Sequence, residues 1–205
     1  MPLIAAEQLP WLALAVASAC AAGIRPFGTA FMLVAGGAMG VLQVPASLSG
    51  PFTGPGLLLL AALALAERVA DGRALAGQDE DWLLCALRIP AGAVLAGVIA
   101  EQGGLPVGWL VLLGAVLAAA TQAAKASVRA FLRAVEAPGG AFVVALLVDV
   151  GVVAALWMAP KHSIALLACG LLALTSSLPS LVWWGREWRS RVRHARSHGA
   201  RVQRH

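Results

Sequence analysis

Residues 138–160 read PGGAFVVALLVDVGVVAALWMAP, and one ionisable residue, Asp149, lies near the centre of this apolar run. About 20 apolar residues of α-helix are needed to cross the hydrocarbon core of a bilayer, so the run predicts a transmembrane helix. Its carboxylate then lies close to the bilayer midplane. A charge at that depth costs about 2.5 kcal/mol or more. We therefore expect Asp149 to be protonated, hydrated or paired with a residue elsewhere in the chain.

The composition of the whole chain points the same way. Of the 205 residues, 60% are hydrophobic and 12% are charged, whereas soluble domains carry about 25% charged residues. We expect an all-α fold, a polytopic transmembrane helical bundle with six to seven hydrophobic segments. These segments are 9–24, 27–43, 55–70, 83–100, 105–124, 139–158 and 162–183.

The first two segments are short for complete spans and are separated by Arg25-Pro26. Proline removes a backbone donor and disfavours helix at the residue before it, so the helix is expected to break there. The two segments are either two thin, tilted spans or one re-entrant hairpin. The break also has two interpretations, a simple cytoplasmic turn or a broken helix of the kind that forms substrate and ion sites in transporters.

The distribution of basic residues predicts the orientation. If the arginine-rich C-terminus is cytoplasmic, the inner ends of the segments hold most of the cations and the outer connections hold Lys161 alone. The inner cations are Arg25, Arg68, Arg73, Lys125, Arg129 and Arg133. The positive-inside rule then places the N-terminus outside and the C-terminus in the cytoplasm of a bacterial plasma membrane. We divide the chain into a transmembrane domain, 1–184, with a charged cytoplasmic loop at 67–82, and a basic cytoplasmic tail, 185–205.

The tail is expected to anchor the last helix to the membrane surface. Tryptophans favour the interface, and arginines beside them attract anionic lipids. The residues concerned are Trp183, Trp184, Arg186, Trp188 and Arg189. Seven of the chain's 15 basic residues lie from Gly185 onward, so the net charge of +5 describes this tail, and we expect no nucleic-acid partner.

The cysteines and histidines predict no metal site, cofactor or disulfide framework. Cys20, Cys85 and Cys169 each lie in an apolar run, with no CxxC motif and no cluster with histidine. The chain has no HExxH, GxSxG or phosphate-loop motif, so we do not expect an enzyme. Small residues spaced four apart, such as Gly36 and Gly40, favour close helix packing within the monomer or in a homo-oligomer.

The remaining charged residues form the candidate site for a substrate or an ion. Helical spacing places several of them near the inner ends of the segments, on shared faces. The candidates are Asp149, Arg88, Lys125, Arg129, Glu67 and Asp71. In one interpretation they line an inward-opening polar cavity; in the other the cations snorkel to the interface and the carboxylates are solvated helix ends.

Asp149 itself has two interpretations. An intramembrane carboxylate is a functional-site hypothesis, and a buried ion pair that locks two helices together is the rival. We expect Lys125 or Arg129 to be its partner, because both lie near the inner end of the preceding segment.

Four motifs occur in an order that resembles a known family. They are LAERVAD from Leu65, RIPAGAVLAG from Arg88, QAAKASVRA from Gln122, and APGG with LLVDV ending at Val150. Together they resemble bacterial membrane proteins of the domain-of-unknown-function 4126 family, over roughly 18–174. The resemblance implies an integral membrane protein and supplies no activity. It points to the same acidic and basic positions as the charge pattern.

Two positions depart from that family's pattern. Gln122 stands where the resemblance implies a histidine, and Val148 precedes Asp149 where it implies a second acid. A proton-relay role for that histidine therefore does not transfer to this chain.

We expect a transporter or channel-like protein for a small solute, an ion or a lipid headgroup. The alternative is a membrane interaction or assembly protein whose intramembrane charges pair structurally.

Overall fold

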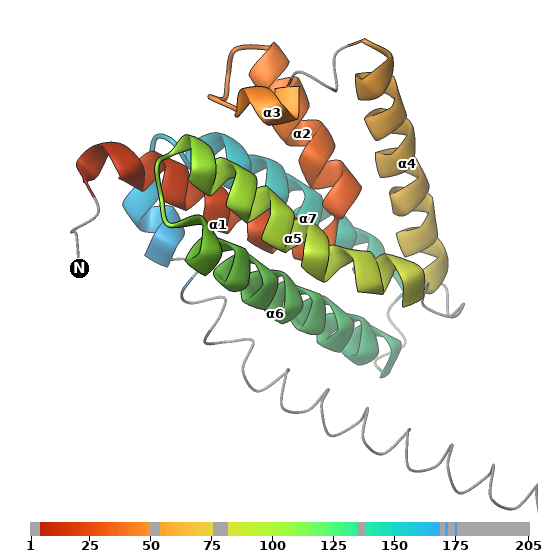
Figure 1. Cartoon of the computed structure of the whole chain (residues 1–205). Helices are drawn as coiled ribbons and strands as arrows, with labels where there is room; N and C mark the ends of the chain where they lie inside the picture. Colours follow the sequence, from red (N-terminus) through yellow and green to blue (C-terminus); the bar gives the residue numbers. More distant parts are fainter. Residues whose placement is uncertain are drawn as a thin grey trace, which may run out of the picture.

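The computed structural model describes residues 5–49, 54–75, 82–134, 138–168, 171 and 175. Every regular element in these ranges is a helix, so the expected all-α class is confirmed. The elements are a 3-10 turn at Ala6–Gln8, α1 (Leu9–Ile24), α2 (Pro26–Ala38), α3 (Ala46–Ser49), α4 (Pro55–Leu75), α5 (Trp82–Gln102), α6 (Val107–Ala134) and α7 (Pro138–Met158). A further helical turn covers 163–168 (Figure 1).

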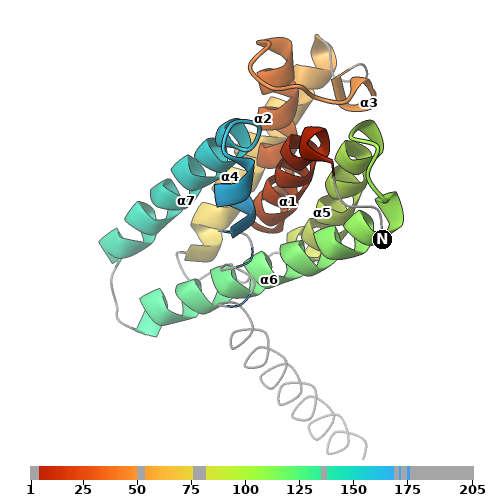
Figure 2. The same ribbon diagram turned by 90° about the vertical axis from the view of Figure 1, so that its left-hand side faces the viewer.

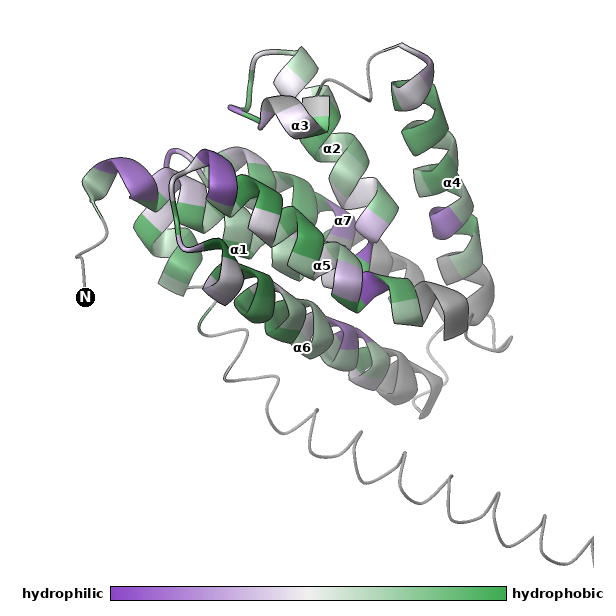
Figure 3. Cartoon of the chain, in the orientation of Figure 1, coloured by the Kyte–Doolittle hydropathy of each residue, from purple (hydrophilic) through white to green (hydrophobic). Residues whose placement is uncertain are grey.

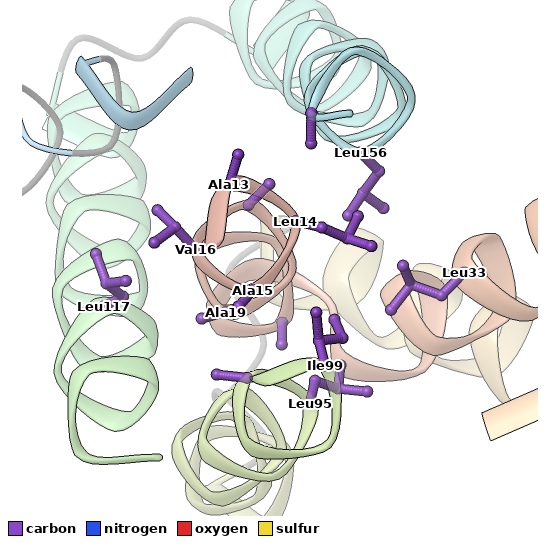
Figure 4. Packing of buried hydrophobic residues seen from close by; sticks show 14 of the residues in the cluster. Ala13, Leu14, Ala15, Val16, Ala19, Leu33, Leu95, Ile99, Leu117 and Leu156 are labelled. Atoms are coloured by element: carbon purple, nitrogen blue, oxygen red, sulfur yellow. The ribbon is translucent and has the colours of Figure 1, made fainter. Parts of the chain in front are cut away.

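Helix α1 is the centre of the bundle. It packs against α5 and α6 most extensively and also contacts α2 and α7 (Figures 1 and 2). Alanine recurs along it, and Ala13, Ala15 and Ala19 are fully buried. Small side chains let neighbouring backbones approach from several sides, which larger residues would prevent. Larger apolar residues from the surrounding helices, including Leu33 and Ile99, fill the space around it (Figure 4).

Helices α5 and α6 form a tight hairpin beside α1. Its turn contains Gly104 at φ 62°, a left-handed conformation that glycine adopts at little cost. Further along the hairpin, Gly114 faces Gly92, and a Cβ added to Gly114 would lie 2.7 Å from the Gly92 carbonyl oxygen. The two backbones are therefore in direct contact. The Gln8 side chain donates to the Gly104 carbonyl at 3.1 Å, which places the start of α1 beside this turn.

Helices α2 and α4 form a second group. Helix α4 packs chiefly on α2, and the two stand beside the group of α1, α5 and α6 (Figure 1). Helix α2 ends five residues earlier than the second apolar segment predicts, because Gly40 adopts φ 69°. The amides of Val41 and Leu42 then bond back to the Gly36 carbonyl and close the helix end.

Helix α4 also differs from its expected length. The range 67–82 was expected to be a loop, yet α4 remains helical through Leu75, and 76–81 lie outside the described residues. The reason is tertiary: Glu67 is buried against α2 rather than solvated. Its charge therefore marks a buried contact within the helix and not the end of the apolar segment.

The outer surface of the bundle is apolar. Two helical stretches, Ala6–Ile24 and Val107–Val128, are long and apolar enough to cross a membrane. Large hydrophobic side chains on the outward faces are more than half exposed, among them Leu58, Leu65, Val94, Leu112, Leu147 and Val150. Hydrophobic colouring covers much of α4, α5 and α6 in Figure 3. Exposed apolar patches of this extent mark a surface that meets a membrane or another protein.

Candidate functional site

The site is organised by the break between α1 and α2. Arg25 is the single residue between the two helices, and its backbone (φ −149°, ψ 89°) is not helical. Pro26 takes the first position of α2, where its missing N–H costs nothing because a first-turn amide has no helical partner. The break predicted at Arg25-Pro26 is confirmed. It leaves the last carbonyls of α1 and the first amides of α2 close together inside the bundle.

A cation meets the C-terminal end of α1. The Lys125 ammonium, on α6, donates to the Ile24 carbonyl oxygen at 2.8 Å. Helix C-termini carry partial negative charge from carbonyls that have no helical donor, so an ammonium group stabilises this end. Lys125 or Arg129 was expected to be the partner of Asp149. The ion pairs of Asp149 in the described residues are instead with Arg25 and Arg68, and the side chain of Arg129 lies outside those residues.

A carboxylate meets the N-terminal end of α2. Glu67 Oε2, on α4, accepts hydrogen bonds from the Phe27 and Gly28 amides, each at 3.2 Å. The Glu67 side chain is only 2% exposed. Helix N-termini carry partial positive charge, so a carboxylate is favourable there. The Thr29 hydroxyl adds a 2.7 Å hydrogen bond to the Arg25 carbonyl and completes the first turn.

Asp149 pairs with two arginines. The Arg25 guanidinium contacts one carboxylate oxygen and the Arg68 guanidinium contacts the other. Arg25 comes from the helix break, Arg68 from α4 and Asp149 from α7, so the carboxylate joins three elements. The side chains of Arg25, Asp149 and Arg68 are 14%, 27% and 35% exposed. All three side chains are thus more exposed than that of Glu67.

Arg88 lies deeper. Its side chain on α5 is 2% exposed, and its guanidinium donates to the side-chain oxygen of Gln122 at 2.8 Å. Gln122 is one helical turn before Lys125 on α6, so this contact lies next to the capped end of α1. Gln122, which stands where the family resemblance implied a histidine, therefore accepts a hydrogen bond from the buried Arg88.

Together these residues form what we call the break cluster, whose members are Arg25, Glu67, Arg68, Arg88, Gln122, Lys125 and Asp149. They come from the α1–α2 junction and from α4, α5, α6 and α7. In Figure 3 hydrophilic stretches of α4, α5 and α6 lie toward the same end of the bundle. The cluster combines guanidinium, ammonium and carboxylate groups around two helix ends, an arrangement suited to binding a charged or strongly polar solute.

Several predicted residues are not tested by this geometry. Asp71 and Arg129 lie on α4 and α6, but their side chains are outside the described residues. The proposed membrane anchor is outside them as well, namely Trp183, Trp184, Arg186, Trp188 and Arg189. Among the described residues, no three His, Cys, Asp or Glu side chains come together in a way that could hold a metal ion.

Two members of the cluster were missed as site residues. Arg68 was treated as a topology signal, and Gln122 as a departure from a motif. The available signal for Arg68 was its place beside Glu67 in a helical segment, where consecutive residues point about 100° apart and contact different neighbours. Nothing local to Gln122 indicates that it accepts from Arg88.

Comparison with known proteins identifies the family. No curated protein and no solved structure matches the chain significantly. The profile of one family, described as "Domain of unknown function (DUF4126)", matches residues 12–183. The match includes every member of the break cluster and confirms the family that the sequence motifs resembled. The chain therefore belongs to the DUF4126 family.

Proposed function

We propose that the protein is a polytopic integral membrane protein that transports a small solute, an ion or a lipid headgroup, and that the break cluster binds it. The observation that carries this proposal is an inverted polarity. Glu67 and Arg88 are 2% exposed inside the bundle, whereas Leu58 and Leu112 are 73% and 61% exposed on its surface. Soluble proteins rarely bury such charged side chains unless they are paired, and they rarely expose large apolar patches as well.

The proposed topology follows from the two ends of the bundle. The break cluster marks the cytoplasmic side, in agreement with its basic residues. The start of α1 and the α5–α6 turn, joined by the Gln8–Gly104 hydrogen bond, mark the outer side. The N-terminus is then outside the plasma membrane and the C-terminus inside. The basic tail would contact anionic lipids of the inner leaflet.

The packing divides the helices into two groups that could move relative to each other. Helix α2 packs with α4, and α1 packs with α5 and α6, while Arg25 is the single residue that links α1 to α2. Broken helices in transporters place substrate at their exposed ends, and access changes when one group of helices moves against the other. In this proposal the α2–α4 group moves about Arg25, and the contacts of Asp149 change as it does.

Reconstitution tests this function. We would place the protein in liposomes, load a panel of inorganic ions and small organic acids and bases, and follow uptake together with charge movement. Wild type should transport at least one member of the panel, and Arg25→Gln should reduce that transport at least tenfold. Lys161→Gln is the matched control, since it also removes one positive charge but lies beyond the far end of α7. Equal transport by wild type, Arg25→Gln and empty liposomes would overturn the proposal.

The second candidate is a non-enzymatic assembly or interaction protein whose intramembrane charges pair structurally. A specific observation favours it: Lys125 and Glu67 each hold a helix end, and Asp149 holds two arginines. In that case the Arg25→Gln protein should lose thermal stability, and neither it nor wild type should transport any member of the panel.

A further inference from the structure

We propose that Arg25 and Arg68 form a binding site for a phosphate-class oxyanion, and that Asp149 takes the place of this anion when none is bound. The inference deepens the proposed function, on which it rests for the location of the site. It names a chemical class of ligand for the break cluster and assigns a role to each residue of the Arg25–Asp149–Arg68 triplet.

The geometry of the triplet is the first argument. Arg25 contacts one oxygen of Asp149 and Arg68 contacts the other, each through one terminal nitrogen, so the guanidiniums flank a single carboxylate. A guanidinium presents five N–H donors in a planar fork that suits the oxygens of carboxylate and phosphate. A phosphate group offers more oxygens than a carboxylate and can accept from both arginines at once.

Charge is the second argument. Within the described part of the chain, the break cluster brings together four cations and two carboxylates: Arg25, Arg68, Arg88 and Lys125 with Glu67 and Asp149. Electrostatic interactions are strong where water is scarce, so this surplus favours an anion over a cation.

Accessibility is the third argument. Glu67 and Arg88 are 2% exposed, whereas Arg68 and Asp149 are 35% and 27% exposed. The triplet is therefore the edge of the cluster that a ligand can reach without unpacking the helices. An incoming oxyanion would exchange with the Asp149 carboxylate at Arg68, the most exposed of the three side chains.

The position of the triplet links binding to movement. Arg25 lies at the junction of the two helix groups, Arg68 on α4 and Asp149 on α7. Replacement of Asp149 by a soluble anion releases α7 from the other two elements while the arginines stay together. Binding would therefore loosen one helix without separating α4 from the break.

Two sources can supply this chemistry, free inorganic phosphate and the phosphodiester of an anionic phospholipid. The test separates them. Protein purified in a neutral detergent and stripped of lipid is titrated with sodium phosphate, with sodium chloride at equal ionic strength as the control, and binding is followed by calorimetry and by the unfolding temperature. A parallel titration uses mixed micelles with phosphatidylglycerol or with phosphatidylcholine.

Four proteins are compared: wild type, Arg68→Gln, Asp149→Asn and Lys161→Gln. A hydrogen bond to a charged group is stronger than one between neutral groups, so Arg68→Gln should weaken binding about tenfold or more. Asp149→Asn removes the competing carboxylate and should tighten binding, with a larger phosphate-dependent rise in unfolding temperature. Lys161→Gln should match wild type. Should Asp149→Asn fail to fold, the comparison of wild type with Arg68→Gln decides alone.

Each outcome has one meaning. Saturable binding of inorganic phosphate that Arg68→Gln weakens supports the site with a free anion as ligand. Binding only in phosphatidylglycerol micelles, weakened by the same variant, supports it with a lipid headgroup. No saturable binding in either titration, or binding unaffected by Arg68→Gln, overturns the inference. Binding without flux in liposomes would keep this site and reject transport, whereas flux without anion binding would do the reverse.

Discussion

Glu67 and Lys125 stabilise opposite ends of the same helix break, each with the charge that its helix end favours. The Lys125 ammonium lies 2.8 Å from the Ile24 carbonyl oxygen, and the Glu67 carboxylate lies 3.2 Å from the amides of Phe27 and Gly28. Backbone groups at a break buried within the bundle have little water to bond with, and each costs about 1–3 kcal/mol when left without a partner. These two side chains make the break tolerable.

Lys125→Met should destabilise the protein by about 1–3 kcal/mol, since the Ile24 carbonyl loses a charged donor at a helix C-terminus. Thermal unfolding in detergent measures the change. Lys161→Met is the matched control, because Lys161 is exposed beyond α7. Equal unfolding temperatures for the two variants would mean that the Lys125 cap contributes nothing.

Glu67 should respond to two substitutions in a fixed order. Glu67→Gln keeps an oxygen that can accept from Phe27 and Gly28 but removes the charge, so we expect a loss of about 1 kcal/mol. Glu67→Ala removes the acceptor too and should cost about 2–3 kcal/mol. Unfolding in a graded denaturing detergent gives both values. The reverse order, or no difference, would contradict the capping role.

Asp149 should couple energetically to Arg68 and not to Lys125. In a double-mutant cycle, Asp149→Asn and Arg68→Gln should show a coupling energy of about 0.5–3 kcal/mol, toward the lower end because Arg68 is 35% exposed. The cycle of Asp149→Asn with Lys125→Met should be additive within about 0.5 kcal/mol. Thermal unfolding in phosphate-free buffer provides both cycles. Coupling to Lys125 alone would contradict the pairing seen in the structure.

Glycines in the bundle should divide into two classes. A Cβ on Gly23 would lie 2.0 Å from the Thr121 hydroxyl oxygen and 2.4 Å from the Ala118 carbonyl oxygen, whereas one on Gly151 would meet nothing within 4 Å. We expect Gly23→Ala to destabilise by about 1–3 kcal/mol through overpacking. Gly151→Ala should stabilise by about 0.5–1 kcal/mol through helix propensity. The unfolding temperatures of the two variants test this contrast.

The proposed orientation can be measured with single cysteines on a background in which Cys20, Cys85 and Cys169 are replaced by alanine. A cysteine at Lys161, which is exposed, should react with a membrane-impermeant maleimide added to intact cells. A cysteine at Gly199, in the basic tail, should react only after the cells are opened. The opposite labelling pattern would invert the topology.

The helices were predictable because their signals are local. Apolar runs and the Arg25-Pro26 pair predicted a first segment at 9–24 and a break after it, and α1 spans Leu9–Ile24. The end of α4 was not predictable in this way. Charges from Glu67 onward read as the start of a solvated loop, although Glu67 is buried by a contact with amides 40 and 39 positions away.

The sequence predicted which residues belong to the candidate site better than it predicted which of them contact each other. Residue type and depth singled out Asp149, Arg88 and Lys125. The partner of Asp149 was chosen from the preceding helix, but the partners are Arg25 and Arg68, the latter 81 positions away. Which helices become neighbours depends on packing around α1, where small residues admit several arrangements that periodicity alone does not distinguish.

The distance in sequence between the break and its caps has a consequence for biogenesis. In the membrane topology proposed above, the chain enters the membrane as it is synthesised, and Lys125 emerges 101 positions after Ile24. Until α4, α6 and α7 are inserted, the polar groups of α1 and the break must therefore be satisfied by water, lipid or the insertion machinery. Helix α1 is made first, but its main partners α5 and α6 come later in the chain, so a chain truncated before α6 should be a substrate for membrane quality control.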